Sequence, residues 1–311
     1  MATVVAIPAG PALRWSLLRS AVALLGLVTL FVWAWRQRPT ALSGGWHAPM
    51  LAGAVLALCS LLAYSARFRH VMRLLDLDVN RLASLRIVSF AVFCQFFVPV
   101  GGGAELAKFL KLRGLAPQRR AVISAAGVAL EHIIGLATLV ATASALFAIL
   151  NPFPLKVDPL LVVIAALTVL ALAVTVLLRR QGGSGLDARQ LLAQLHARKS
   201  DAALALGWSL LMHVLLAAAV YVGSLGWAMP IGYWQIFFVL SAAGMLQAVP
   251  ANLLGIGAAD VAGSGLYVAL GLSLSNAILL ASLLISYRLL VALSGGLWEL
   301  DRARRVMAAE R

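Results

Sequence analysis

Six apolar segments dominate this sequence, and each is long enough to cross a bilayer as a helix, which takes about 20 residues. Hydrophobic residues make up 62% of the 311-residue chain and charged residues 12%, whereas a soluble domain carries roughly 25% charged residues. The sequence therefore predicts an all-α polytopic membrane protein without a second, soluble domain. The predicted spans are 17–35, 47–66, 121–150, 159–178, 202–225 and 275–298.

Two further apolar regions, 86–113 and 233–271, are interrupted in the middle by proline and glycine. The first is interrupted at "VPVGGGAE" and the second at "VPANLLGIGAAD". Two basic clusters flank the first interruption, and basic residues favour the cytoplasmic side of a membrane. One cluster belongs to a predicted cytoplasmic loop and consists of Arg67, Arg69, Arg73, Arg81 and Arg86. The other follows the interruption and consists of Lys108, Lys111, Arg113, Arg119 and Arg120. A re-entrant hairpin keeps both clusters in the cytoplasm, whereas a full crossing would place one of them outside. The alternative to a hairpin is that the two short segments of this region each cross the membrane.

The order of these segments is helix, helix, hairpin, helix, and it occurs twice with opposite orientation. Such an inverted-topology repeat is typical of secondary transporters. We therefore expect one transmembrane domain over residues 1–311, with pseudo-repeat halves 1–150 and 151–311 and with both termini in the cytoplasm. The weak internal similarity of the halves consists of Val-Pro, then glycines, then an acidic residue in each hairpin.

The formal net charge of +14 is compatible with binding either nucleic acid or an anionic membrane. Cytoplasmic loops rich in Lys and Arg account for it, and there is no soluble module to hold nucleic acid, so we expect no nucleic-acid partner. Cys59 and Cys94 lie in apolar runs and the five histidines are scattered. This pattern predicts no metal site, no disulfide framework and no cofactor.

Irregular backbone at membrane depth is tolerated where protein buries it or where it lines a wet cavity. We therefore expect the two hairpin tips to meet around a polar cavity, where glycine allows close approach and helix N-termini attract anions such as phosphate. The predicted substrate-binding residues are Gly101, Gly102, Gly103, Lys108, Gly255, Gly257 and Arg288.

Three acidic residues are candidates for proton coupling: Glu105, Glu131 and Asp260. Glu105 and Asp260 each follow a glycine in the first turn of a restarted helix, so capping of that helix is the alternative role. Lys108 lies three residues after Glu105, so a local ion pair is the alternative to phosphate contact. Arg288 needs an acid or a ligand within its span, and Glu131, Asp260 and a lipid phosphate are the possible partners.

Four motifs in order resemble the lysylphosphatidylglycerol synthase transmembrane region family, which consists of flippase-like integral membrane proteins. Family members carry Pro-Gly-x-x-Gly-Gly-Asp/Glu-x-x-Arg, then Glu-Arg-x-x-Gly-Leu, then Pro-Gly-x-Gly-x-x-Glu and a late Arg. The similar stretches here are "VPVGGGAELAK" (98–108), "EHIIGL" (131–136), "VPANLLGIGAAD" (249–260) and Arg288. The chain departs from the family pattern at Lys108 and His132, which replace arginines, and at Asp260, which replaces a glutamate.

The resemblance implies translocation or handling of lipids such as aminoacylated phosphatidylglycerol or polyprenyl-linked sugars. Synthase members of the family append a soluble aminoacyl transferase region, and this chain ends at Arg311 without one, so the resemblance does not imply aminoacyl transfer.

We hypothesise a flippase or lipid-linked transporter of the inner membrane that moves an anionic or glycosylated lipid by alternating access. A phospholipid or polyprenyl-linked lipid is the expected partner. A membrane enzyme or an accessory subunit in lipid modification is the alternative, although no nucleophile and base are arranged for catalysis. Homo-oligomerisation and a lipid-modifying enzyme partner stay open.

Overall fold

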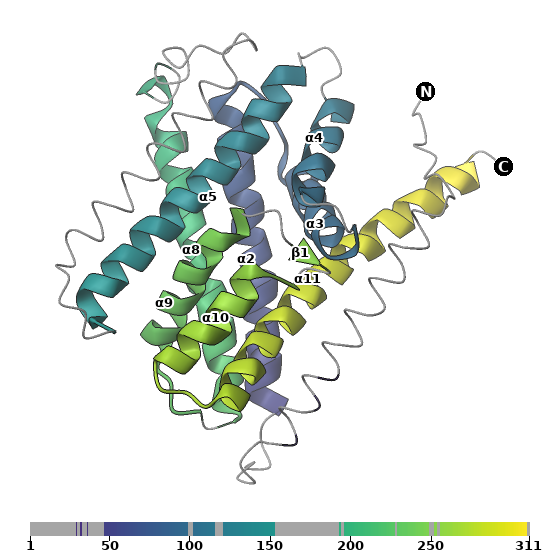
Figure 1. The fold of residues 1–311 in the computed structure, drawn as a ribbon. Helices are drawn as coiled ribbons and strands as arrows, with labels where there is room; N and C mark the ends of the chain where they lie inside the picture. Colours follow the sequence, from purple (N-terminus) through teal and green to yellow (C-terminus); the bar gives the residue numbers. More distant parts are fainter. Residues whose placement is uncertain are drawn as a thin grey trace.

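The fold is built from helices packed side by side (Figure 1). A computed structural model of the chain describes residues 47–98, 102–115, 121–152, 196–227, 229–248, 252–253 and 256–309, together with positions 29, 32, 36 and 193. The predicted all-α class is confirmed over these residues. The α-helices are α2 (His47–Leu74), α3 (Arg81–Phe97), α4 (Gly103–Leu115), α5 (Ala121–Leu150), α8 (Lys199–Leu225), α9 (Tyr233–Gly244), α10 (Ala258–Ala269) and α11 (Leu274–Ala309).

Four of these helices are long and apolar enough to cross a membrane: His47–Leu74, Ala121–Leu150, Lys199–Leu225 and Leu274–Asp301. Four of the six predicted spans thus coincide with helices that are long and apolar enough to cross a membrane. The predicted span 159–178 lies outside the described residues, as do Gly101 and Gly255, and within 17–35 the structure describes positions 29 and 32 alone.

The helix α2 is longer than the predicted span 47–66, because it continues to Leu74. Arg67, expected at the start of a cytoplasmic loop, is therefore a buried residue inside a helix, with 5% of its surface exposed. That expectation was wrong because hydropathy alone cannot anticipate a charge that is neutralised by a partner on another helix.

Both predicted interruptions are present as breaks between helices. The first separates α3 from α4, and Gly102 in this break has a φ of 85°, a left-handed conformation that favours glycine. The second follows α9, where a 3₁₀ turn, η1 (Met245–Ala248), precedes a two-residue antiparallel pairing of β1 (Asn252–Leu253) with β2 (Ile256–Gly257). The helix α10 begins directly after this pairing.

The helices α2 and α8 lie side by side at the centre of the molecule (Figure 1). The other contacts between helices occur in matched sets. The helix α5 packs on α9, and in the same way α11 packs on α3. The pair α3 and α4 matches the pair α9 and α10. The contact between α4 and α5 likewise matches the contact between α10 and α11. Among the eight described α-helices, each main contact on one side of the α2–α8 pair thus has a counterpart on the other.

Close approach of α11 to the central pair depends on glycine. Tyr287 of α11 inserts its hydroxyl between Gly53 of α2 and Gly223 of α8, where any added Cβ would overlap the tyrosine oxygen. The same hydroxyl donates a hydrogen bond to the carbonyl of Met50 over 3.0 Å. These contacts fix the position of Arg288, the next residue, relative to the central helices.

Candidate functional site

Glu131 of α5 is the centre of a buried charge cluster that three helices assemble. Lys108 Nζ from α4 donates to Glu131 Oε2 over 2.6 Å, and Arg67 Nη2 from α2 donates to Glu131 Oε1. The exposed fractions are 1% for Glu131, 2% for Lys108 and 5% for Arg67. Two basic side chains in this cluster therefore share a single carboxylate.

Two further side chains surround the cations of this cluster. The ring of Tyr64 lies 4.6 Å from the Arg67 guanidinium carbon and 5.2 Å from Lys108 Nζ, within the range of cation–π attraction. Arg67 Nη1 also donates to Ser209 Oγ of α8 over 3.2 Å. Among the residues that the structure describes, Arg67 Nε has no hydrogen-bond partner. The guanidinium therefore keeps one buried donor available.

This cluster forms part of the wall of a cavity of about 750 Å³. Gly102 and Gly103, at the break before α4, line the same cavity, as does the Glu105–His132 pair. Glu105 Oε1 lies 3.8 Å from His132 Nδ1, and about two fifths of each side chain is exposed. The cavity thus joins a buried cationic wall to a more accessible acid–imidazole pair.

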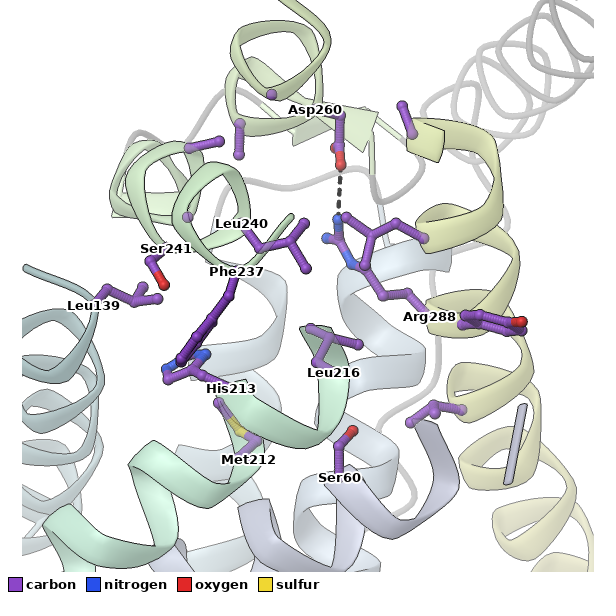
Figure 2. A pocket seen from close by; sticks show the side chains of 18 of the residues that line it. Ser60, Leu139, Met212, His213, Leu216, Phe237, Leu240, Ser241, Asp260 and Arg288 are labelled. Carbon is purple, nitrogen blue, oxygen red and sulfur yellow. Dashed lines mark hydrogen bonds and ion pairs between the residues drawn. The ribbon is translucent and has the colours of Figure 1, made fainter. Parts of the chain in front are cut away.

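A second acid–cation pair lies at the other hairpin. Figure 2 shows Arg288 extending from α11 to Asp260 at the start of α10, and the two groups are 2.9 Å apart. Asp260 Oδ2 also accepts the backbone N–H of Gly257 over 2.8 Å, which caps α10. The Arg288 guanidinium carbon lies 5.7 Å from the centre of the Phe96 ring. Asp260 therefore caps a helix and neutralises a partly buried cation at the same time.

The Glu105–His132 and Asp260–Arg288 pairs occupy equivalent places in the chain. Glu105 and Asp260 each lie in the first turn of the helix that follows a break, α4 and α10. Their partners, His132 and Arg288, each lie on the long helix that follows, α5 and α11. This equivalence places one acidic residue with a basic partner at the start of each restarted helix.

The Asp260–Arg288 pair lines a smaller cavity of about 170 Å³ (Figure 2). Residues before both breaks contribute to the walls of both cavities, Gln95 near the end of α3 and Gly244 at the end of α9. The other shared residues are Tyr64, Leu139, Met212 and His213. The two cavities are therefore neighbours, separated by these side chains.

Most of the residues predicted for the site gather around these two cavities. Those at the larger cavity are Gly102, Gly103, Glu105, Lys108 and Glu131, and those at the smaller one are Asp260 and Arg288. Gly257 is buried at the start of α10 and donates to Asp260.

Two pairings that the sequence left open are resolved. Lys108 binds Glu131 rather than Glu105, and Arg288 binds Asp260. Sequence reasoning missed Arg67 because four further arginines follow it within twenty residues, which is typical of a cytoplasmic loop. The spacing of Tyr64 and Arg67, three residues apart and so on one helix face, was the available signal.

A search of curated proteins finds no match to this chain. The family model described as the lysylphosphatidylglycerol synthase TM region matches residues 11–295. That match covers both hairpins, both cavities and all four long apolar helices up to residue 295. The chain is therefore an integral membrane protein that belongs to the lysylphosphatidylglycerol synthase TM region family.

Proposed function

We propose that this protein is a flippase or lipid-linked transporter that moves an anionic or glycosylated lipid across the inner membrane. The observation that carries the proposal is the buried cluster of Arg67, Lys108 and Glu131, because its two basic side chains share one carboxylate at the wall of a cavity of about 750 Å³. Buried cations without full compensation are costly, and within membrane proteins they mark substrate or ion pathways. A lipid phosphate would supply a second anionic partner.

The reciprocal packing of the two halves supports an inverted repeat. Among the eight α-helices that the structure describes, each main contact has a counterpart, and the Glu105–His132 pair corresponds to the Asp260–Arg288 pair. In the proposed architecture, α3 with α4 and α9 with α10 are re-entrant hairpins from opposite faces, and six helices span the membrane. Residues 1–150 and 151–311 form the two halves of one domain, with both termini cytoplasmic.

In the proposed mechanism, the two halves rock against each other around the hairpin tips while the lipid tails stay in the bilayer. Without substrate, the Glu131 carboxylate holds both Arg67 and Lys108. An incoming phosphate competes with that carboxylate for the same donors. Once Glu131 has lost its two basic partners, its protonated form is favoured, so it takes up a proton. Glu131, Glu105 and Asp260 are thus the proposed proton-coupling groups.

The remaining predicted residues have supporting roles in this proposal. Gly101, Gly102 and Gly103 let the headgroup approach the backbone at the start of α4, and Gly255 and Gly257 do so at the start of α10. Because Asp260 already accepts the Gly257 N–H, the α4 end is the more available of the two to an anion.

Lipid movement in reconstituted vesicles tests the proposal. Phosphatidylglycerol carrying a fluorescent group on one acyl tail would be bleached from outside by dithionite, with and without protein. We expect the wild-type protein to move the lipid, and Lys108→Met to slow it about tenfold, since a buried charge-assisted hydrogen bond to the phosphate is lost. Movement at the rate of protein-free vesicles would refute the flippase assignment.

Lys111→Met is the matched control for Lys108→Met. Lys111 is one turn further along the same helix, pairs with Glu299 over 2.6 Å and lines neither cavity. We expect this variant to move lipid at a rate close to that of the wild type. Equal loss in both variants would show that general positive charge, rather than the cavity cluster, supports movement.

A further inference from the structure

The first hairpin is packed against α11 at backbone distance. At Gly295 of α11 an added Cβ would lie 2.1 Å from the carbonyl oxygen of Ser89 on α3, and at Gly296 it would lie 2.5 Å from Cε2 of Phe93. Contacts this close resist sliding of one helix along the other, because a close-packed interior has no spare volume to accept the displaced atoms. The first hairpin and α11 are therefore firmly joined.

Two side-chain contacts fasten the same hairpin to α11 closer to its C-terminal end. The guanidinium carbon of Arg86 on α3 lies 5.2 Å from the centre of the Trp298 ring, within the range of cation–π attraction. Lys111 Nζ on α4 donates to Glu299 Oε2 over 2.6 Å. Both helices of the hairpin thus bind α11, and we refer to α3, α4 and α11 together as the α11 unit.

The second hairpin is joined to α5 in a corresponding way. An added Cβ at Gly244, the last residue of α9, would lie 3.2 Å from Leu139 Cδ1 on α5. The rings of Phe147 on α5 and Phe238 on α9 have their centres 6.2 Å apart. Within the hairpin, an added Cβ at Gly263 of α10 would be in van der Waals contact with α9. We refer to α5, α9 and α10 together as the α5 unit.

The contacts between the two units are of a different kind. The larger cavity is lined by α4 and α5 and the smaller one by α10 and α11, so each cavity lies where the units meet. Three acid–base pairs at these cavities each have one member on either unit: Lys108–Glu131, Glu105–His132 and Arg288–Asp260. Side-chain pairs beside a cavity can separate and form again, whereas interlocked helices must repack.

The central α2–α8 pair contacts both units, and a tyrosine hydroxyl anchors each of them to it. Tyr287 of the α11 unit donates to the carbonyl of Met50 on α2 over 3.0 Å. Tyr233 of the α5 unit donates to the carbonyl of Val214 on α8 over 3.3 Å. The central pair is therefore suited to act as an axis between the units.

We infer that the protein moves as two rigid units, the α11 unit and the α5 unit, which turn against each other about the α2–α8 pair, and that the three acid–base pairs hold them together. The inference rests on the proposed function and redraws its moving bodies. Each unit combines the hairpin of one sequence half with the long helix of the other half. An anion that separates Lys108 from Glu131 would thereby also act on the Asp260–Arg288 pair, through the rigid units.

Distances between spin labels in the full-length protein test the inference. In a background with Cys59→Ala and Cys94→Ala, cysteines for labelling would replace two residues at a time. The four positions are exposed, and they are Gly114 on α4, Leu274 on α11, Ala121 on α5 and Val268 on α10. Double electron–electron resonance would be recorded in phosphatidylcholine nanodiscs with and without phosphatidylglycerol.

The same four positions give two kinds of pair. Gly114 with Leu274 and Ala121 with Val268 each lie within one unit, so we expect one narrow distance that phosphatidylglycerol leaves unchanged. The exchanged pairs, Gly114 with Val268 and Ala121 with Leu274, cross between the units and should give broader distances that shift with the lipid. If the halves 1–150 and 151–311 were the rigid bodies, all four pairs would cross between them and all four would change.

Cross-linking supplies a functional test of the same division. Lys111→Cys with Glu299→Cys joins two helices of one unit, although the two residues belong to different sequence halves. A short reducible cross-linker at this pair should therefore leave lipid movement in the dithionite assay unchanged. A loss of movement that reduction restores would overturn the division into these units.

The distance measurements can also overturn the inference. They would do so if none of the four distances changed, or if the pairs within one unit changed as much as the exchanged pairs. The outcome is separable from that of the proposed function. Changes confined to the exchanged pairs in a protein that moves no lipid would remove the flippase alone, and lipid movement with equal changes in all four pairs would remove the two units alone.

Discussion

Lys108 Nζ lies 2.6 Å from Glu131 Oε2, and both side chains are buried although they come from different helices. Glu105 lies one helical turn from Lys108 on α4, yet it pairs with His132 instead. Lys108 is therefore held by tertiary structure rather than by a local ion pair. Lys108 lies at the cavity wall together with Arg67, so two basic side chains share the Glu131 carboxylate there.

Glu131→Gln is expected to lower stability more than any other single change in the cluster. It leaves two buried cations without a carboxylate, and removing one partner of a buried ion pair costs about 3–5 kcal/mol. Adding Lys108→Met should restore part of the loss, because only one cation then needs compensation. Thermal unfolding in detergent of the single variants and of the double variant would measure this coupling. Strictly additive losses would contradict the shared-carboxylate arrangement.

Arg288→Ala is expected to reduce lipid movement, because it leaves Asp260 buried without its guanidinium partner. Asp260→Asn keeps an acceptor for the Gly257 N–H and so retains the cap on α10, while it loses the charge pair. We therefore expect the double variant Arg288→Ala with Asp260→Asn to be more stable than Arg288→Ala alone. Dithionite bleaching of vesicles and thermal unfolding would be measured on the same preparations. If the Arg288→Ala variant moves lipid at the wild-type rate, Arg288 has no role in the proposed mechanism.

Gly223→Ala is expected to destabilise the protein by about 1–3 kcal/mol, the usual cost of overpacking. The added Cβ would overlap the Tyr287 hydroxyl and lie 2.9 Å from Leu283 Cδ2. Tyr287→Phe should partly rescue the variant, since it removes the overlapping oxygen. Gly207→Ala on the same helix is the control, because nothing lies within 4 Å of its added Cβ. Unfolding temperatures should fall for Gly223→Ala alone and stay level or rise for Gly207→Ala.

The proposed hairpins predict a labelling pattern from the two sides of the membrane. In a background without Cys59 and Cys94, Asp78→Cys and Gly114→Cys should react with a membrane-impermeant maleimide from the cytoplasmic side only. Pro152→Cys, just beyond α5, should react from the opposite side only. The side chain of Asp78 is 90% exposed and an added Cβ at Gly114 meets nothing within 4 Å, so both sites suit labelling.

Labelling of Asp78→Cys and Gly114→Cys from opposite sides would mean that α3 and α4 cross the membrane, which would end the re-entrant proposal. The same comparison for the second hairpin uses Pro230→Cys and Ser273→Cys, which flank α9 and α10 and should both react from outside. Intact and inverted vesicles would supply the two orientations.

The sequence by itself determined the features that depend on local composition. Long apolar runs predicted the four helices that the structure describes as candidate spans, because hydropathy and length are summed over one continuous segment. Proline and glycine likewise predicted the breaks before α4 and α10, since both residues act on their own backbone. Glu105 and Asp260 were also predicted from the sequence, because their position in the first turn after each break is a local feature.

Only the tertiary structure decided which charges meet and where. The burial of Arg67 and its contact with Glu131, 64 positions away, depend on how α2 and α5 pack, and a run of arginines gave the opposite expectation. The pairing of Lys111 with Glu299, 188 positions away, likewise has no signal in the sequence, because it depends on how α4 lies against α11. Ion pairing and hydrogen bonding depend on distances between side chains from different helices, and local hydropathy does not contain those distances.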